Sequence, residues 1–66
     1  MATTRLLLST GDQLEVEGSI DGVTKELENA ARSGSGTLAR LKVADTGEPL
    51  AINAAHVVAI RVGTND

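Results

Sequence analysis

The only histidine of the chain, His56, lies where a short polar stretch meets a run of aliphatic residues, INAAHVVAIRV (residues 52–62). Imidazole titrates near neutral pH, which makes His56 the side chain best suited here to acid–base catalysis. A catalytic histidine also needs a nucleophile or an orienting carboxylate beside it. Its sequence neighbours Asn53, Ala54, Ala55 and Val57 supply neither group. Because Asn53 is a typical turn residue, we interpret His56 as the boundary between a turn and a strand.

Two other patterns are typical of chemical sites, an acidic pair and a Gly-Ser segment. Glu15 and Glu17 share one face of a predicted strand, about 7 Å apart, and paired carboxylates can bind a divalent cation or act as an acid–base pair. Arg40 and Lys42 on a neighbouring strand favour ordinary cross-strand ion pairing instead. The segment SGSG (33–36) follows a predicted helix, whereas a phosphate-binding loop precedes one. The sequence therefore predicts no enzyme, no cofactor and no metal site.

The length and composition predict one small domain, residues 1–66, with a thin aliphatic core. Leu, Ile and Val number 17 and Ala adds 9, while Phe, Tyr, Trp and Cys are absent. Disulfides and the common zinc sites are therefore excluded as stabilising devices. Small domains that lack them usually associate with a partner, so we expect a homo-oligomer or a protein partner.

Charge and the amino-terminal stretch restrict the class of protein further. The net charge of −3 argues against a dedicated nucleic-acid binder, which normally has a basic surface. The stretch MATTRLLLSTGD has an apolar centre of only three leucines, too short for a signal peptide or a membrane span. We therefore expect a cytoplasmic protein that does not enter a membrane and binds no evident small-molecule substrate.

Hydrophobic periodicity predicts five strands and one helix in the order β-β-α-β-β-β. The helix, residues 20–33, begins after Ser19 as N-cap, carries the apolar stripe of Ile20, Val23 and Leu27, and ends before Gly34. The predicted strands are residues 4–9, 13–18, 37–45, 49–53 and 57–62. One apolar helical stripe covers one face of a sheet. We therefore predict a two-layer α+β domain with the helix on a mixed or antiparallel five-stranded sheet, a β-grasp-like or related roll.

The other face of this sheet is the predicted interaction surface. In the last strand Val58, Ile60 and Val62 are expected to point inward, so Val57, Ala59 and Arg61 point outward. The outward set mixes charged residues with more aliphatic ones than a purely solvated face needs. The interface candidates are Leu7, Leu38, Arg40, Val57, Ala59 and Arg61. The sequence thus favours a small, non-enzymatic interaction module that self-associates or binds a protein through its open sheet face.

A second function stays open, a small nucleic-acid-binding or regulatory protein that uses Arg40, Lys42 and Arg61 to contact phosphates. The ending INAAHVVAIRV is similar to the last strands of Sm-like RNA-binding rings. Single-strand readers depend on aromatic stacking, and the chain has no aromatic residue. Its helix is also third in order, where an Sm-like chain would place it first.

Five short patterns carry a resemblance to a family: Glu17–Ser19, Val23 with Leu27, Gly34–Gly36, Asp45–Gly47, and Ala54–Val58 with Gly63. Over about 50 residues they resemble a family of short, mostly actinobacterial proteins of unknown function. The chain departs from that pattern at Asn53, where the family usually has proline, and at His56, where it has a basic or other polar residue. The resemblance implies the same β-β-α-β-β-β layout and no function.

Overall fold

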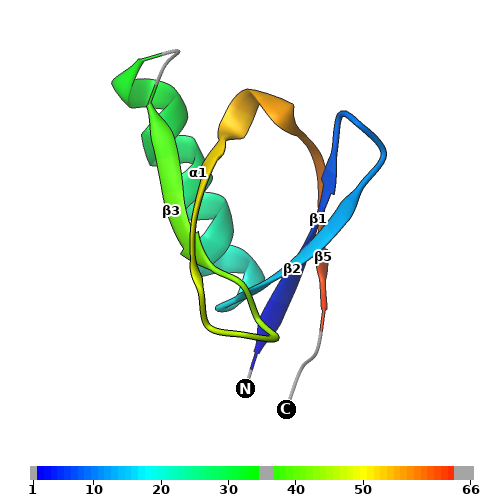
Figure 1. Cartoon of the computed structure of the whole chain (residues 1–66). Helices are drawn as coiled ribbons and strands as arrows, with labels where there is room; N and C mark the ends of the chain where they lie inside the picture. Colours follow the sequence, from blue (N-terminus) through cyan, green and yellow to red (C-terminus); the bar gives the residue numbers. More distant parts are fainter. Residues whose placement is uncertain (1, 35–36, 64–66) are drawn as a thin grey trace.

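The computed structural model describes residues 2–34 and 37–63 of the chain. It confirms an α+β domain with the predicted order of elements (Figure 1). A short 3-10 turn, η1, precedes the last strand. The elements are β1 (Thr3–Leu8), β2 (Gln13–Glu17), α1 (Ile20–Ser33), β3 (Leu38–Lys42), β4 (Pro49–Asn53), η1 (Ala54–His56) and β5 (Val57–Val62).

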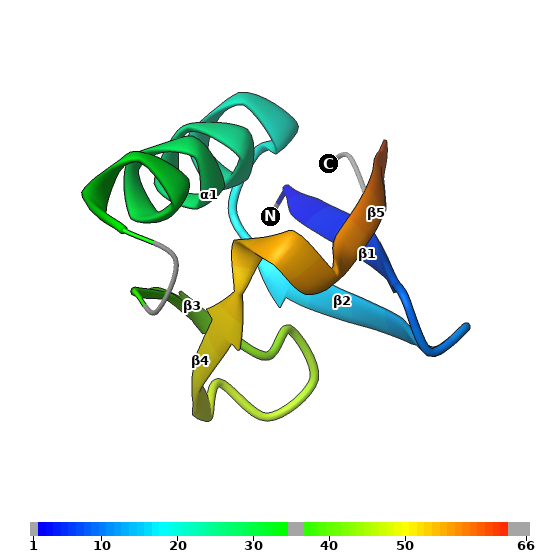
Figure 2. The same ribbon diagram turned by 90° about the horizontal axis from the view of Figure 1, so that it is seen from above.

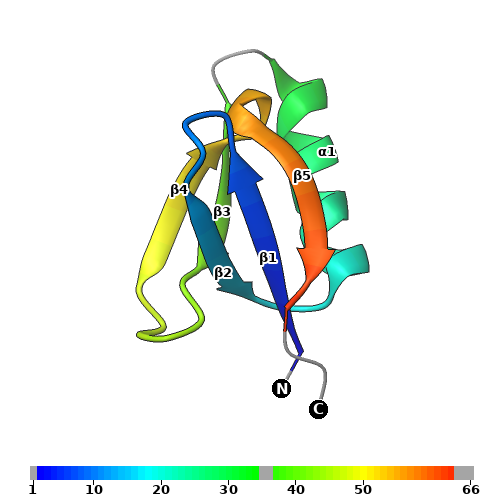
Figure 3. The same cartoon turned by 90° about the vertical axis from the view of Figure 1, so that its right-hand side faces the viewer.

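The five strands form two small antiparallel sheets. The first has the order β2-β1-β5 and the second is the β3-β4 hairpin. They meet at a single bridge between Val16 and Val43, next to which the Ala44 N–H donates to the Glu15 carbonyl at 2.9 Å. The pairing is antiparallel, one of the two predicted alternatives, but the strands form two sheets and not the single five-stranded sheet predicted. The two sheets and α1 surround a common interior (Figures 2 and 3).

Two glycines form the hairpin turns, and Ser19 caps the helix as predicted. Gly11 and Gly47 have φ angles of +93° and +71°, a region that residues with a Cβ rarely adopt. Each lies in one of the two hairpin turns. The Ser19 hydroxyl accepts a hydrogen bond from the Gly22 N–H at 3.2 Å and so caps the start of α1. At 14 residues α1 is short, and no helix in the described part of the chain is long and apolar enough to cross a membrane.

The core is small and aliphatic, as the composition predicts. Leu6 and Val16 are fully buried, and the stripe of α1 packs over them. Thr4, the buried polar residue, donates from its hydroxyl to the Gly18 carbonyl at 2.9 Å. The buried apolar residues are Leu6, Val16, Val23, Leu27, Ala30 and Ala39. So small a set leaves little stability in reserve.

The predicted phasing of β5 is wrong in its first half. The ladder between β1 and β5 shifts register after Leu7, so that Leu7 faces Ala59 while Leu8 faces Val57. This β-bulge makes Val58 the extra residue and moves the residues before it to the other face. Val57 therefore packs against the core and is not an outward interface residue. Val58, which was expected to point inward, is 61% exposed. Val62 keeps its predicted face, opposite the buried Thr4, but is 55% exposed.

Candidate functional site

The outer face of the three-stranded sheet carries a charged row beside a largely apolar one. The register places Arg5 of β1 between Glu15 of β2 and Arg61 of β5. One step further along β1, Leu7 lies between Gln13 and Ala59. A hollow of about 370 Å³ is lined by Arg5, Leu7, Gln13, Ala59 and Arg61. The face therefore has a cationic end and an apolar floor.

Glu15 is the acid next to Arg5 on this face, and it pairs within its own sheet. One carboxylate oxygen of Glu15 lies 3.4 Å from an Arg5 guanidinium nitrogen, and the other accepts from the Thr3 hydroxyl at 2.7 Å. The described ion pair of Glu15 is with Arg5, and not with Arg40 or Lys42 of the other sheet as predicted. Among the described residues no hydrogen bond or ion pair joins the Arg61 guanidinium to an acid.

Gly63, just after β5, lies beside Thr3 at the end of this charged row. Its N–H donates to the Thr3 carbonyl at 3.0 Å. A Cβ at position 63 would lie 2.5 Å from the Thr3 hydroxyl oxygen and 3.3 Å from Cδ of Glu15. Glycine is therefore required here by close approach of the neighbouring side chains.

Replacing Gly63 by alanine should lower the free energy of unfolding by about 1–3 kcal/mol, because the added methyl must displace Thr3 and Glu15. Urea denaturation followed by far-ultraviolet circular dichroism measures it. The double variant with Thr3→Ala should lose less than the sum of the two single losses, since it removes the nearest clashing atom. Additive losses would contradict this account.

The open edge of β5 is a second candidate surface, after the outer face of the sheet. β5 pairs only with β1, and the bond from Gly63 to Thr3 shows which of its residues face that strand. Since pairing alternates along an antiparallel ladder, Ile60 and Val62 direct their backbone N–H and C=O groups away from β1. Val58 and Val62 expose their side chains at the same edge. Open backbone groups beside exposed valines are typical of a surface that accepts another strand.

The outer edge of the second sheet differs in this respect. β4 begins with Pro49, which lacks an N–H and is a common protection of sheet edges. β5 contains no proline and no acidic residue. Of these two edges, β5 is therefore the one better suited to pairing.

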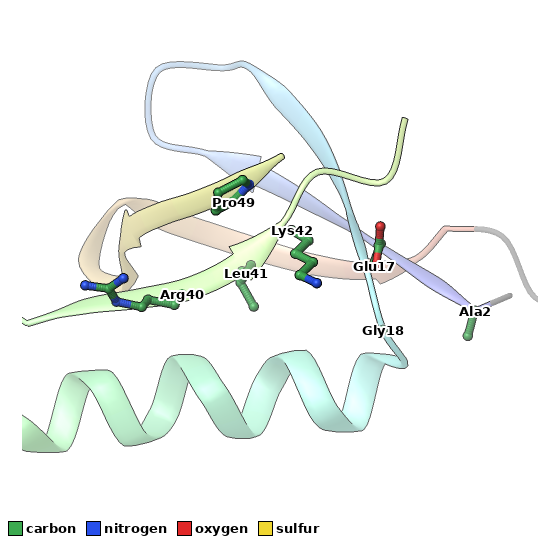
Figure 4. Close-up of a pocket in the computed structure, with 7 residues that line it drawn as sticks. All are labelled: Ala2, Glu17, Gly18, Arg40, Leu41, Lys42 and Pro49. Atoms are coloured by element: carbon green, nitrogen blue, oxygen red, sulfur yellow. The ribbon is translucent and has the colours of Figure 1, made fainter. Parts of the chain in front are cut away.

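A larger hollow, about 630 Å³, opens where the two sheets separate, between β3 and the start of α1. Figure 4 shows Leu41 pointing toward α1, with Arg40 and Lys42 on the same strand and Glu17 on β2. The lining residues are Ala2, Glu17, Gly18, Arg40, Leu41, Lys42 and Pro49. Arg61 lines the other hollow, so the predicted strip of Arg40, Lys42 and Arg61 is divided between two surfaces.

The six predicted interface residues are therefore only partly brought together. Leu7, Ala59 and Arg61 line one hollow on the outer face. Leu38, which is 49% exposed, and Arg40 belong to β3 of the other sheet. The sixth, Val57, packs against the core. The exposure of Val58 was missed because it is the extra residue of a bulge, which leaves no local signal in the sequence. Val62 keeps its predicted face but lies at the open edge of the sheet.

His56 ends η1 and directly precedes β5, which confirms its place at a boundary. Its ring Nδ1 lies 3.2 Å from the Ser9 hydroxyl, and its carbonyl accepts from the Ser9 N–H at 2.7 Å. Asn53 closes the turn by accepting from the Ala55 N–H at 2.9 Å. Both His56 and Ser9 are exposed, and no described acid hydrogen-bonds to the ring. The contact therefore joins the end of β1 to the start of β5.

No group of three or more His, Cys, Asp or Glu side chains that could hold a metal ion occurs among residues 2–34 and 37–63. Comparison with known proteins shows no match, whether to protein-family models, to curated proteins or to solved structures. The resemblance to short actinobacterial proteins therefore stays a prediction.

Proposed function

We propose that this chain is a non-enzymatic interaction module that self-associates through β5, with two copies pairing antiparallel about Ile60. One observation carries the proposal: the two exposed valines of the edge, Val58 and Val62, lie two residues on either side of Ile60. An antiparallel pair centred on Ile60 then places Val58 of each copy opposite Val62 of the other. The edge is complementary to itself, as a two-fold symmetric interface requires.

The backbone supports the same register. Ile60 and Val62 direct their N–H and C=O groups to the open edge, so Ile60 of one copy can exchange both hydrogen bonds with Ile60 of the other. Each cross-strand pair of valines adds roughly 0.2–1 kcal/mol. The two three-stranded sheets would become one continuous sheet, and the exposed valines would be covered.

The thin core gives such an interface a physical purpose. Six buried apolar residues contribute little hydrophobic stabilisation for a chain of 66 residues. Association stabilises the folded state because only the folded chain presents the edge. The module is then more stable as a dimer than as a single chain.

Sedimentation velocity between about 10 µM and about 1 mM tests self-association. We expect the mass to rise with concentration from 6.8 kDa toward twice that value. Over the same range hydrogen exchange at the Ile60 and Val62 amides should slow more than exchange at the Leu38 amide, which belongs to the other sheet. A strict monomer at the highest concentration would contradict the proposal, as would a dimer with unchanged exchange at Ile60 and Val62.

Nucleic-acid binding by Arg40, Lys42 and Arg61 has weaker support. The three cations lie on two separate surfaces, the chain carries a net charge of −3, and it has no aromatic residue for stacking. Binding of an oligonucleotide that weakens with salt and is lost in Arg40→Gln would favour this alternative over self-association through β5.

A further inference from the structure

Arg5 and Arg61 stand directly opposite each other on neighbouring strands. Like charges in that position destabilise a sheet. Of the two guanidinium groups, only that of Arg5 pairs with a described acid, Glu15. Glu15 reaches Arg5 at 3.4 Å and is held on its other side by Thr3 at 2.7 Å. Both arginines line the hollow and no described acid does, so this end of the hollow is cationic.

We propose that this hollow binds a small ligand made of a carboxylate and a short aliphatic body. The two guanidinium groups offer forked N–H donors that match the two oxygens of a carboxylate. Leu7 and Ala59 form the apolar floor beside them, and the Gln13 side chain supplies a polar rim. The volume of about 370 Å³ lies within the range of small-molecule sites.

The arrangement of the two rows selects this class of ligand over others. A bare inorganic anion would bind the arginines and leave the apolar floor of Leu7 and Ala59 exposed to water. A neutral aliphatic molecule would use the floor and leave Arg61 without a described partner of opposite charge. A carboxylate on a chain of a few carbons satisfies both ends, since Leu7 lies one row along β1 from Arg5 on the same face.

The site is independent of the proposed self-association. All five lining residues come from one chain, and none of them is Val58 or Val62. Ligand binding is therefore measured at a concentration where sedimentation shows only monomer. Failure there removes the ligand site alone, whereas a monomer at about 1 mM removes the dimer alone.

Titration of the ¹⁵N-labelled chain with sodium hexanoate at constant ionic strength tests the site. We expect saturable shifts of the Leu7 and Ala59 amide signals. Acetate, with the same charge, should bind at least about fourfold more weakly, the factor that one buried methylene contributes. Hexanamide, with the same aliphatic body and no charge, should cause no saturable shift, and inorganic phosphate should bind more weakly than hexanoate.

Arg61→Gln should weaken hexanoate binding about tenfold or more, because it removes a charged hydrogen-bonding group. Arg40→Gln is the matched control, since it removes the same charge from the other hollow, and it should leave binding unchanged. Equal loss in both variants would overturn the proposal. So would saturable binding of hexanamide, or phosphate binding as tight as that of hexanoate.

Discussion

Replacing Leu6 by alanine should lower the free energy of unfolding by about 2–5 kcal/mol. Leu6 is fully buried, is flanked in the ladder by Leu14 and Ile60, and belongs to a core of six buried apolar residues. The deletion removes apolar contacts from both sheet neighbours at once and leaves a cavity that so small a domain can fill only by shifting its helix. A domain of this length has a total stability of roughly 3–10 kcal/mol, so the variant should be largely unfolded at moderate temperature.

Leu38→Ala is the matched control for this prediction. It removes the same atoms from a side chain that is 49% exposed, and its effect should stay within about 0.5 kcal/mol. Because the chain has no aromatic residue, urea denaturation is followed by far-ultraviolet circular dichroism. All variants are compared at one concentration, since association alters apparent stability. Equal losses for Leu6→Ala and Leu38→Ala would contradict the core described here.

Placing opposite charges at Val58 and Val62 should separate the proposed dimer from every other register. Val58→Asp alone or Val62→Lys alone sets a charge against a valine of the second copy. Each single variant should therefore weaken self-association about tenfold or more, the effect of roughly 1.4 kcal/mol. The double variant should recover most of the lost affinity, because the introduced carboxylate of each copy would then face the introduced ammonium group of the other.

Recovery in the double variant is specific to a pairing centred on Ile60. The combination of Val58→Asp with Leu38→Lys serves as the control, because Leu38 belongs to β3 of the other sheet. It should self-associate no better than Val58→Asp alone. Sedimentation velocity at matched concentrations measures all four variants. If the double variant stays as weak as the single ones, the two copies do not pair about Ile60.

Local structure could be predicted from the sequence because neighbouring residues determine it. The helix predicted over residues 20–33 is observed as Ile20–Ser33, with Ser19 as its N-cap. Gly11 and Gly47 lie in the two hairpin turns and have the positive φ angles that such short connections between strands need. The third strand is shorter than predicted, Leu38–Lys42 rather than residues 37–45, because Val43 instead bridges to β2. Each of the confirmed features depends on residues a few positions apart.

The candidate surfaces depended on contacts between distant segments. The bulge between Leu7 and Leu8 turns Val57 toward the core and leaves Val58 as an exposed extra residue, although alternation alone indicated an outward Val57 and an inward Val58. The register of β1 with β5 sets Arg5 against Arg61. These two strands lie at opposite ends of the sequence, so no local pattern could reveal which of their residues face each other.

The sequence by itself determined the elements, their order, the caps and the small aliphatic core, since these follow from local propensity and periodicity. Only the tertiary structure decided which side chains share a surface. A shift of one residue in strand pairing reverses the face of every side chain beyond it, and that shift is set by the packing of both strands together.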